Sequence, residues 1–220
     1  MSRTIAIGDV HGCSQALSAL LDALALDAHD TVISLGDYVD RGPDSRGVLE
    51  QLLELDRRCH FLPLVGNHER MLLGALDGTM DLRAWRYYGG AETLASYGGG
   101  LAEIADRHLE FLRKCRCFVE TDTHFFVHAN YDAQADLDEQ PESLLLWTHV
   151  STVCPVPHVS GKTAVVGHTP QLDGCVLDLG HLVCIDTCCF ANGWLTALDV
   201  ASGTFWQANE DGSVRTGVLR

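Results

Sequence analysis

The sequence predicts an α/β protein whose core begins with a largely parallel sheet. Three strand-like segments occupy the first third of the chain, each followed by a polar loop and then by a helical pattern: Thr4–Val10, Thr31–Asp37 and His60–Asn67. Strands that alternate with helices usually pair in parallel. From Thr123 onward the pattern changes to closely spaced strands. The length of 220 residues is enough for one sizeable core, so we expect a single domain over residues 1–220.

Helices are predicted wherever apolar residues recur at a spacing of three and four. This spacing follows each of the first three strands, and it predicts helices over Ser14–Leu26, from Ser45 to about Leu55, and from His68 onward. The stretch Arg83–Lys114 also has a helical pattern. A run of three glycines, Gly98–Gly100, is expected to break it.

The second half is predicted to contain six strands joined by turns. These strands are Thr123–Ala129, Thr163–His168, Cys175–Leu179, His181–Asp186, Trp194–Val200 and Thr204–Gln207. Gly180 lies between two of them and indicates a hairpin. The segment Tyr131–Gly161 is long, acidic and interrupted by prolines. Long loops in compact domains are usually functional or disordered, so we interpret this insert as a candidate lid over a substrate.

Composition excludes several classes of protein. The formal net charge is −15, which argues against nucleic-acid binding because phosphate backbones recruit Lys and Arg. No window approaches the roughly 20 apolar residues of a membrane helix. The N-terminal residues enter a strand pattern at once, so we expect no signal peptide and a cytoplasmic location. The nine cysteines lack zinc or redox spacing and are expected to be reduced thiols.

Polar residues gather at the carboxyl ends of five predicted strands. They are Asp9 and His11 in GDVHG, Asp37, Asp40 and Arg41 in GDYVDRG, Asn67 and His68 in GNHE, His128 in VHAN, and His168 in VGHT. Open α/β sheets bind ligands at this edge. Taken singly, a Gly-Asp step can be a turn or a helix cap, and a lone histidine can be a core residue. Together they favour one site, whose oxygen and nitrogen donors suit Mn²⁺, Fe or Zn²⁺.

These five motifs, in this order, resemble the full signature of the metallophosphoesterases of the phosphoprotein phosphatase family. The compact length resembles the bacterial and phage serine/threonine phosphatases. The resemblance extends from Ile5 to about Val200, which is nearly the whole chain. It implies a four-layer α/β/β/α metallophosphoesterase sandwich with two mixed β-sheets.

The resemblance also implies two divalent metal ions, with Mn²⁺ expected and Fe or Zn²⁺ as alternatives. Asp9 and His11 would hold the first ion, Asp37 would bridge to the second, and Asn67, His128 and His168 would complete the second site. Such a pair of ions binds phosphate oxygens and activates a bridging water. The family reaction that follows is in-line attack by a metal-bridging hydroxide.

The remaining roles implied by the resemblance concern the phosphate and the leaving group. Arg41, with Asn67 beside it, would bind the phosphate. His68 would be the general acid, and Asp40 would orient it. Similar phosphatases carry a second phosphate-binding Arg after a Leu-Trp pair, where His149 stands here. Either the alignment differs at this point, or the phosphate clamp is weaker and pH-sensitive, or His149 is an exposed loop residue.

The leading interpretation is a metal-dependent serine/threonine protein phosphatase acting on a phosphoprotein or phosphopeptide. A dinucleoside-polyphosphate hydrolase resembles the same motif set and is the alternative. An inactive metal-binding scaffold is a third reading, which the intact pair Asp40 and His68 argues against. The aromatic residues Trp85, Tyr87 and Tyr88 are either a wall of the substrate site or part of the core. No oligomeric state is predicted.

Overall fold

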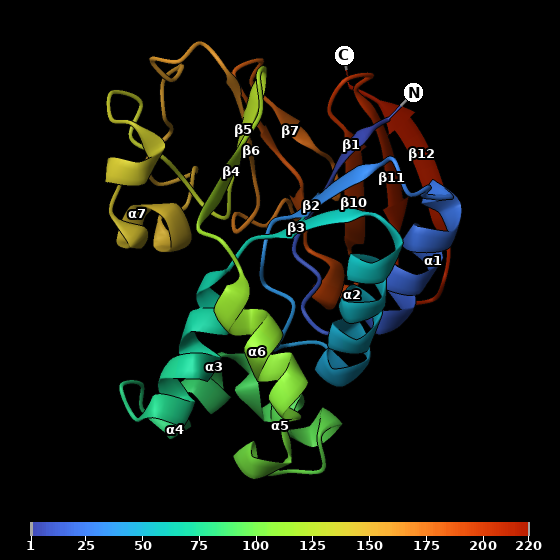
Figure 1. Ribbon diagram of the computed structural model, residues 1–220, viewed down its shortest axis with the longest axis vertical. Helices are drawn as coiled ribbons and strands as arrows, with labels where there is room; N and C mark the ends of the chain where they lie inside the picture. The colour runs from blue at the N-terminus through green and yellow to red at the C-terminus, as the bar shows by residue number, and fades with distance from the viewer. Residues whose placement is uncertain (1, 220) are drawn as a thin grey trace.

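The computed structural model describes residues 2–219, which form two β-sheets packed between helices (Figure 1). The strands of the first sheet are β1 (Thr4–Ile7), β2 (Thr31–Ser34), β3 (His60–Pro63), β9 (Asp186–Thr187), β10 (Trp194–Asp199), β11 (Thr204–Ala208) and β12 (Val214–Val218). Those of the second sheet are β4 (Phe118–Glu120), β5 (His124–Val127), β6 (Thr163–Val166), β7 (Leu177–Asp178) and β8 (Leu182–Cys184).

Residues 2–219 contain seven α-helices, of which the first three each follow one of the first three strands. They are α1 (Ser14–Leu24), α2 (Ser45–Arg58), α3 (Asn67–Asp77), α4 (Leu82–Trp85), α5 (Ala91–Ser96), α6 (Asp106–Lys114) and α7 (Glu142–Trp147). A π-helical turn, Arg86–Gly90, joins α4 to α5. Single 3₁₀ turns occupy residues 101–103, 137–139 and 189–191. In residues 2–219 no helix combines the length and apolar character that crossing a membrane would require.

Both sheets are mixed, as predicted. The first runs β12-β11-β10-β1-β2-β3 with β9 paired to β10, and the second runs β4-β5-β6-β8-β7. The pairs β1·β2 and β2·β3 are parallel, which confirms the parallel start inferred from the strand–helix alternation. Strand β10 pairs antiparallel with β1 and closes the other side of the sheet. Strands β7 and β8 form the antiparallel hairpin predicted around Gly180.

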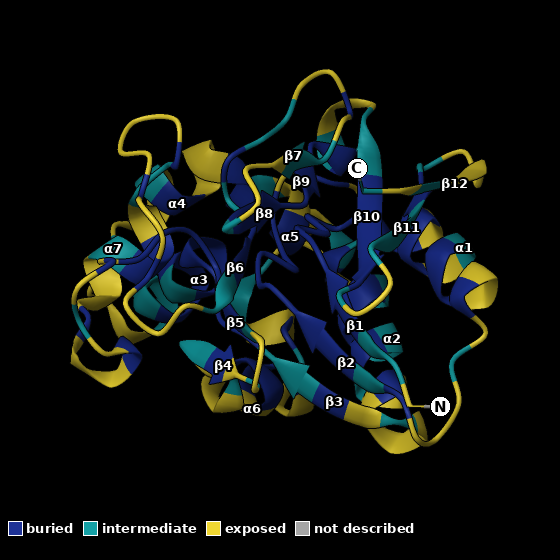
Figure 2. Cartoon of the chain, turned by 90° about the horizontal axis from the view of Figure 1, so that it is seen from above, coloured by how far each residue is buried: buried dark blue, intermediate teal, exposed yellow. Residues whose placement is uncertain are grey.

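Side-chain alternation along the strands produces the four layers. Ile5 and Ile7 of β1 join the core beneath α1 and α2, whereas Ala6 faces the second sheet. In β6, Val165 faces the first sheet, and its neighbours on either side pack in the outer core with α7. Successive strand residues point to opposite faces, so each sheet has two buried faces. Figure 2 shows the resulting buried strands flanked by helices with exposed outer sides. The four-layer prediction is confirmed.

Some elements differ from the predicted ones. Strands β4 and β12 were not predicted: β4 is only three residues long, and β12 is an exposed edge strand. The insert 131–161 was predicted as a loop, yet α7 forms there directly after Pro141. Proline stops a helix interior but is tolerated where a helix begins. The insert supplies the fourth layer through buried residues such as Leu145 and Leu146, and its role as a lid stays a prediction.

The predicted strand His181–Asp186 is divided between the two sheets. Strand β8 belongs to the second sheet, whereas β9 pairs with β10 in the first. Ile185 lies between them in the core that separates the sheets. The chain therefore crosses from one sheet to the other at Ile185, and this crossing brings Asp186 into the centre of the molecule.

Candidate active site

The five motif loops converge where the carboxyl ends of the two sheets meet. Strands β1 and β2 lead into the loops that carry Asp9 and Asp37, β3 leads to Asn67 at the start of α3, and strands β5 and β6 lead into His128 and His168. Two groups of potential metal ligands form there and share Asp37: one contains His11 and His68, the other His128 and His168. Each group offers ligand atoms within 4.8 Å of one another. The strand-end rule thus predicted correctly that these side chains converge.

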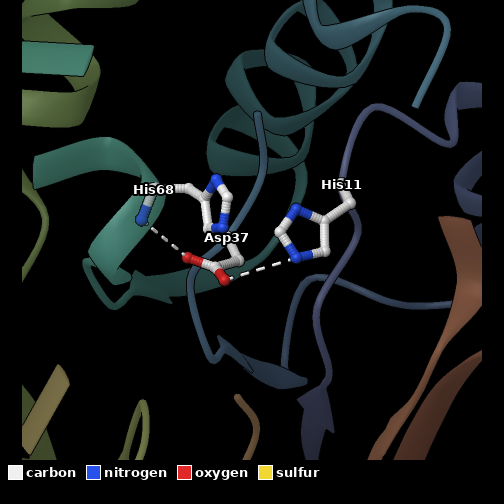
Figure 3. A group of neighbouring side chains, drawn as sticks. All are labelled: His11, Asp37 and His68. Carbon is white, nitrogen blue, oxygen red and sulfur yellow. Dashed lines mark hydrogen bonds and ion pairs between the residues drawn. The ribbon is translucent and has the colours of Figure 1, made fainter. Parts of the chain in front are cut away.

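The first group is drawn in Figure 3, with Asp37 between two histidines. Its Oδ2 lies 3.4 Å from Nε2 of His11, and its Oδ1 accepts a 3.0 Å hydrogen bond from the backbone N–H of His68. Gly66 makes this position possible, because a Cβ there would lie 2.1 Å from Oδ1 of Asp37. The carboxylate is therefore fixed at its position before any ion binds.

The amide of Asn67 lies beside the second group, next to His128. Nε2 of His128 lies 3.5 Å from Oδ1 of Asp37 and 3.0 Å from Oδ1 of Asn67. Nδ1 of His128 donates to the carbonyl of Leu35 at 2.8 Å, and Nδ1 of His11 makes a similar 3.0 Å bond to a backbone carbonyl. A carbonyl only accepts, so each ring carries its proton on Nδ1. Burial lowers the pKa of both rings, so each neutral imidazole keeps a lone pair on Nε2 that a metal can bind.

Two buried polar atoms at the site have no partner within residues 2–219. They are Oδ1 of Asp9 and Nε2 of His168. The other oxygen of Asp9 accepts a 2.9 Å bond from the backbone N–H of His168, so the two residues are neighbours. Buried acceptors without donors are costly unless something binds them. The carboxylate, imidazole and amide groups around these two atoms are of the types that coordinate divalent cations.

The pKa shifts of the site residues also favour the binding of divalent cations. Burial, followed by the charges of Asp186 and Asp37, raises the pKa of Asp9 well above its usual value. Burial lowers the pKa of His11 well below its usual value and that of His168 to about 3. A divalent cation binds imidazoles in their neutral form. It would also neutralise the negative charge of carboxylates that lie close together.

Asp40 and His68 form a buried pair beside the ligand groups. Nδ1 of His68 lies 2.8 Å from Oδ2 of Asp40. The same oxygen accepts a 2.8 Å bond from Nε1 of Trp85, and Oδ1 accepts a 2.6 Å bond from the hydroxyl of Thr93. Burial opposes the charge on His68, but Asp37 and Asp40 outweigh it and raise the pKa of that imidazole. The pair is thus arranged to hold a proton on a fixed imidazole.

Thr93 was not predicted, and Trp85 was left open between a substrate wall and the core. Trp85 is fully buried, but its indole N–H is directed at Asp40. A buried Trp needs a hydrogen-bond partner for its indole N–H, and this requirement was the one signal in the sequence for a polar contact of Trp85.

Arg41 lies at the rim of the site with an exposed side chain. Its guanidinium carbon lies 4.7 Å from the ring centroid of Phe190, and its Nη1 lies 3.1 Å from Nε2 of His11. Stacking on Phe190 restricts the guanidinium while leaving N–H groups available for an anion. The position suits the predicted phosphate contact.

Strained backbone marks the same residues. His11, Asp37, Asp40, Arg41 and His168 all have positive φ, between 45° and 73°. Left-handed conformations are uncommon outside glycine and persist where the surrounding structure imposes them, frequently at functional sites. Here the left-handed residues lie in the loops that follow β1, β2 and β6, three of the five loops that form the site.

Glu69 is a second residue that the sequence prediction missed, although it completes the GNHE motif. It is fully buried, and its carboxylate accepts backbone N–H bonds from Asp37, Tyr38 and Gly66 at 2.8 Å and from Val39 at 3.3 Å. One side chain thus fixes the loop after β2 to the start of α3. Glu at this position follows the capping pattern of helix starts, which was the available signal.

Asp186 was predicted only as the last residue of a strand, yet it lies at the site, where its charge acts on Asp9. It is buried, its carboxylate accepts the backbone N–H of Cys188 at 3.0 Å, and burial raises its pKa to about 7. It reaches the site because the chain changes sheets at Ile185. No local pattern in the sequence indicates such a crossing.

His149 lies next to the second ligand group. The centroid of its half-buried ring is 4.5 Å from that of His168. It follows α7 within the insert, so the fourth layer delivers it to the site. This places His149 at the rim of the site, in contact with a predicted metal ligand.

The fold and this arrangement of residues are those of a metallophosphoesterase, and comparison with known proteins agrees. The family model for the calcineurin-like phosphoesterases matches residues 2–199. The chain belongs to the calcineurin-like phosphoesterase family, whose members use divalent metals. The resemblance inferred from the five motifs is therefore confirmed.

Relatives within the family differ in the substrates that their names state. Serine/threonine-protein phosphatase 1 of Salmonella typhimurium is 31% identical over 173 residues, which cover 74% of this chain and 77% of the relative. The symmetrical bis(5'-nucleosyl)-tetraphosphatase of Nitrosomonas europaea is 35% identical over 129 residues, covering 57% of this chain and 44% of the relative. The crystal structure of a cold-active protein-tyrosine phosphatase from a Shewanella species superposes with a TM-score of 0.70 at 17% identity, covering 98% and 80% of the two chains. That last likeness concerns the fold.

Proposed function

We propose that this phosphoesterase hydrolyses phosphate monoesters on seryl and threonyl side chains of proteins. The buried Asp40–His68 pair carries the proposal. An alkoxide is a poor leaving group and needs a proton as it departs, whereas a good leaving group does not. An enzyme with a fixed imidazole beside its ligand groups is equipped for alkyl phosphates.

The proposed cofactor is a pair of divalent cations, with Mn²⁺ as the expected metal. Asp9, His11 and Asp37 would hold one ion, and Asp37, Asn67, His128 and His168 the other. Asp37 belongs to both ligand groups, and Oδ1 of Asp9 and Nε2 of His168 are buried without a partner among the described residues, which supports this assignment. When bound, such ions neutralise phosphate oxygens and supply an activated water for in-line attack.

The other steps belong to the side chains of this protein. Arg41 would bind the phosphoryl oxygens with its exposed guanidinium, positioned by Phe190. His68 would donate the proton on Nε2 to the departing oxygen, because its Nδ1 is bound to Asp40. Asp40 would stabilise the imidazolium, and its own position would rest on Trp85 and Thr93.

Hydrolysis of dinucleoside polyphosphates is the second candidate, because a relative named for that substrate is 35% identical. Coverage favours the first candidate. The match to the serine/threonine phosphatase spans 77% of that relative, and the match to the tetraphosphatase spans 44%.

One assay separates the two candidates. The protein with added Mn²⁺ is tested in parallel on a phosphoserine peptide, a phosphotyrosine peptide and diadenosine tetraphosphate. We expect the phosphoserine peptide to have the highest kcat/KM. Dominant cleavage of diadenosine tetraphosphate would replace the proposal by the second candidate.

Trp85→Phe is expected to lower kcat on a phosphoserine peptide by roughly tenfold, since supporting hydrogen bonds of catalytic groups are typically worth 10–100-fold. The change removes the N–H that holds Asp40 and keeps an aromatic ring in the core. The loss on p-nitrophenyl phosphate should be smaller, because its leaving group needs no proton. Thr93→Val removes the other donor to Asp40 and should behave in the same way. Equal losses on both substrates would assign Trp85 a packing role alone.

His149→Arg is expected to lower KM for a phosphopeptide by about threefold to tenfold, the range of one added charged hydrogen bond at a partly exposed site. Arg keeps its full charge at all working pH values and can contact two phosphate oxygens. His149→Ala is the matched control and should raise KM. If neither variant changes KM, His149 is a bystander and does not bind phosphate.

A further inference from the structure

Two tyrosines and two arginines form an exposed surface next to the candidate active site. Its residues are Arg83, Arg86, Tyr87 and Tyr88, here named the Arg83–Tyr88 surface. Tyr87 and Tyr88 are 86% and 53% exposed as whole residues, and their ring centroids lie 5.7 Å apart in an edge-to-face arrangement. Figure 1 shows α4 and α5, which flank these tyrosines, in the group of helices below the sheets. Adjacent exposed aromatic residues commonly mark a binding surface.

This surface is anchored at both ends to residues of the site. On one side, Trp85 donates its indole N–H to Asp40. On the other, the carbonyl of Gly89 accepts a 3.1 Å bond from the backbone N–H of Arg41. Gly89 has φ 115°, and a Cβ there would lie 2.6 Å from that nitrogen, so the two backbones approach as closely as they can. The kinked turn Arg86–Gly90 between these anchors presents Tyr87 and Tyr88 to solvent.

The arginines give the surface a charge opposite to that of the whole protein. Within residues 2–219, Arg83 and Arg86 form no ion pair with a carboxylate. Of the acidic residues adjacent in sequence, Asp81 caps α4 by accepting the N–H of Ala84 at 2.9 Å, and Glu92 lies on α5. In a chain of net charge −15, two guanidinium groups that form no ion pair among the described residues attract anionic groups to this segment, which contacts Arg41 through the backbone of Gly89.

We propose that the Arg83–Tyr88 surface binds the polypeptide on either side of the phosphorylated residue, and that it selects acidic and aromatic neighbours. In this complex the arginines contact acidic side chains of the substrate peptide, and the tyrosines pack against an apolar or aromatic side chain of that peptide. The inference rests on the proposed protein phosphatase activity. A peptide fits better than a nucleobase, because the open face of Tyr87 offers no second wall and base-binding pockets enclose both faces of the ring.

Three substrates and three variants test this surface in the full-length protein. The substrates are a phosphoserine peptide flanked by Asp, Glu and Phe, the same peptide with Ala at those positions, and free O-phosphoserine. The variants are the double changes Tyr87→Ala with Tyr88→Ala and Arg83→Gln with Arg86→Gln, and the control Arg58→Gln. Arg58 is an exposed arginine at the end of α2, next to the start of β3 and thus at the opposite edge of the sheet.

Both double variants are expected to lower kcat/KM on the acidic peptide by roughly fivefold to tenfold, mainly through KM, which is the size of a few surface contacts. The loss on the Ala peptide and on free phosphoserine should be smaller, so the preference for the acidic peptide should fall. Arg58→Gln should leave that preference at its parental value. The effect of the arginine variant should also shrink in high salt.

Several results would overturn this inference. An unchanged preference in both double variants would exclude the surface from peptide binding. Equal losses on peptide and free phosphoserine would place its role at the reaction centre, and a larger loss on diadenosine tetraphosphate would make the occupant a nucleotide. If the parent protein cleaves p-nitrophenyl phosphate but no phosphopeptide, the proposed function fails together with this inference. Peptide cleavage with unaffected variants overturns this inference alone.

Discussion

Asp37→Asn is expected to lower turnover by about a hundredfold or more and to reduce bound metal. Asp37 is the one residue shared by both ligand groups. An amide keeps the shape and can still accept the N–H of His68, but it loses the charge that both ions would share. It also directs an NH₂ group toward Nε2 of His11. Supporting contacts of metal sites are worth 10–100-fold, and a shared ligand should exceed that.

Two measurements check this expectation. Metal content after dialysis, measured by mass spectrometry, should fall with kcat on a phosphoserine peptide. Asp22→Asn, at an exposed position on the outer side of α1, is the matched control and should change neither. Parental activity together with parental metal content in Asp37→Asn would refute the assignment of Asp37 as a bridging ligand.

Motif residues could be predicted from the sequence because each one follows a strand. A strand that ends in Gly-Asp, or in Gly-Asn-His, fixes both the residue type and its place at the edge of the sheet. Three parallel strands then bring Asp9, Asp37 and Asn67 together without further information. The four layers, in contrast, were implied by the family resemblance and not by the apolar pattern alone.

Residues that support the motifs could not be predicted in this way. Trp85 and Thr93 contact Asp40 from 45 and 53 positions away in the chain, and nothing local indicates that pairing. Asp186 joins the site only because the chain changes sheets at Ile185. These residues depend on tertiary packing, which periodicity and spacing do not encode. Variants of these supporting residues therefore test contacts that the structure shows and that the sequence motifs do not predict.

His68→Asn is expected to lower kcat on a phosphoserine peptide by about 10²–10⁴-fold, the usual contribution of a general acid. The loss on p-nitrophenyl phosphate should be far smaller, because nitrophenolate leaves without a proton. The discriminating quantity is the ratio of the two losses, since damage to metal binding or folding would affect both substrates alike. Asn can retain a hydrogen bond to Asp40, so the buried carboxylate is not left unpaired.

His68 also lies in the first ligand group, so the same ratio decides between two roles for it. His11 and Asp37 offer ligand atoms close to those of His68, which by proximity alone could make it a metal ligand. Its Nδ1, however, is bound to Asp40, an arrangement that suits a proton donor. His60→Asn, at the exposed start of β3, controls for the loss of an imidazole elsewhere. Equal losses on the two substrates, with less bound metal, would make His68 a ligand; a large ratio with parental metal content would establish it as the acid.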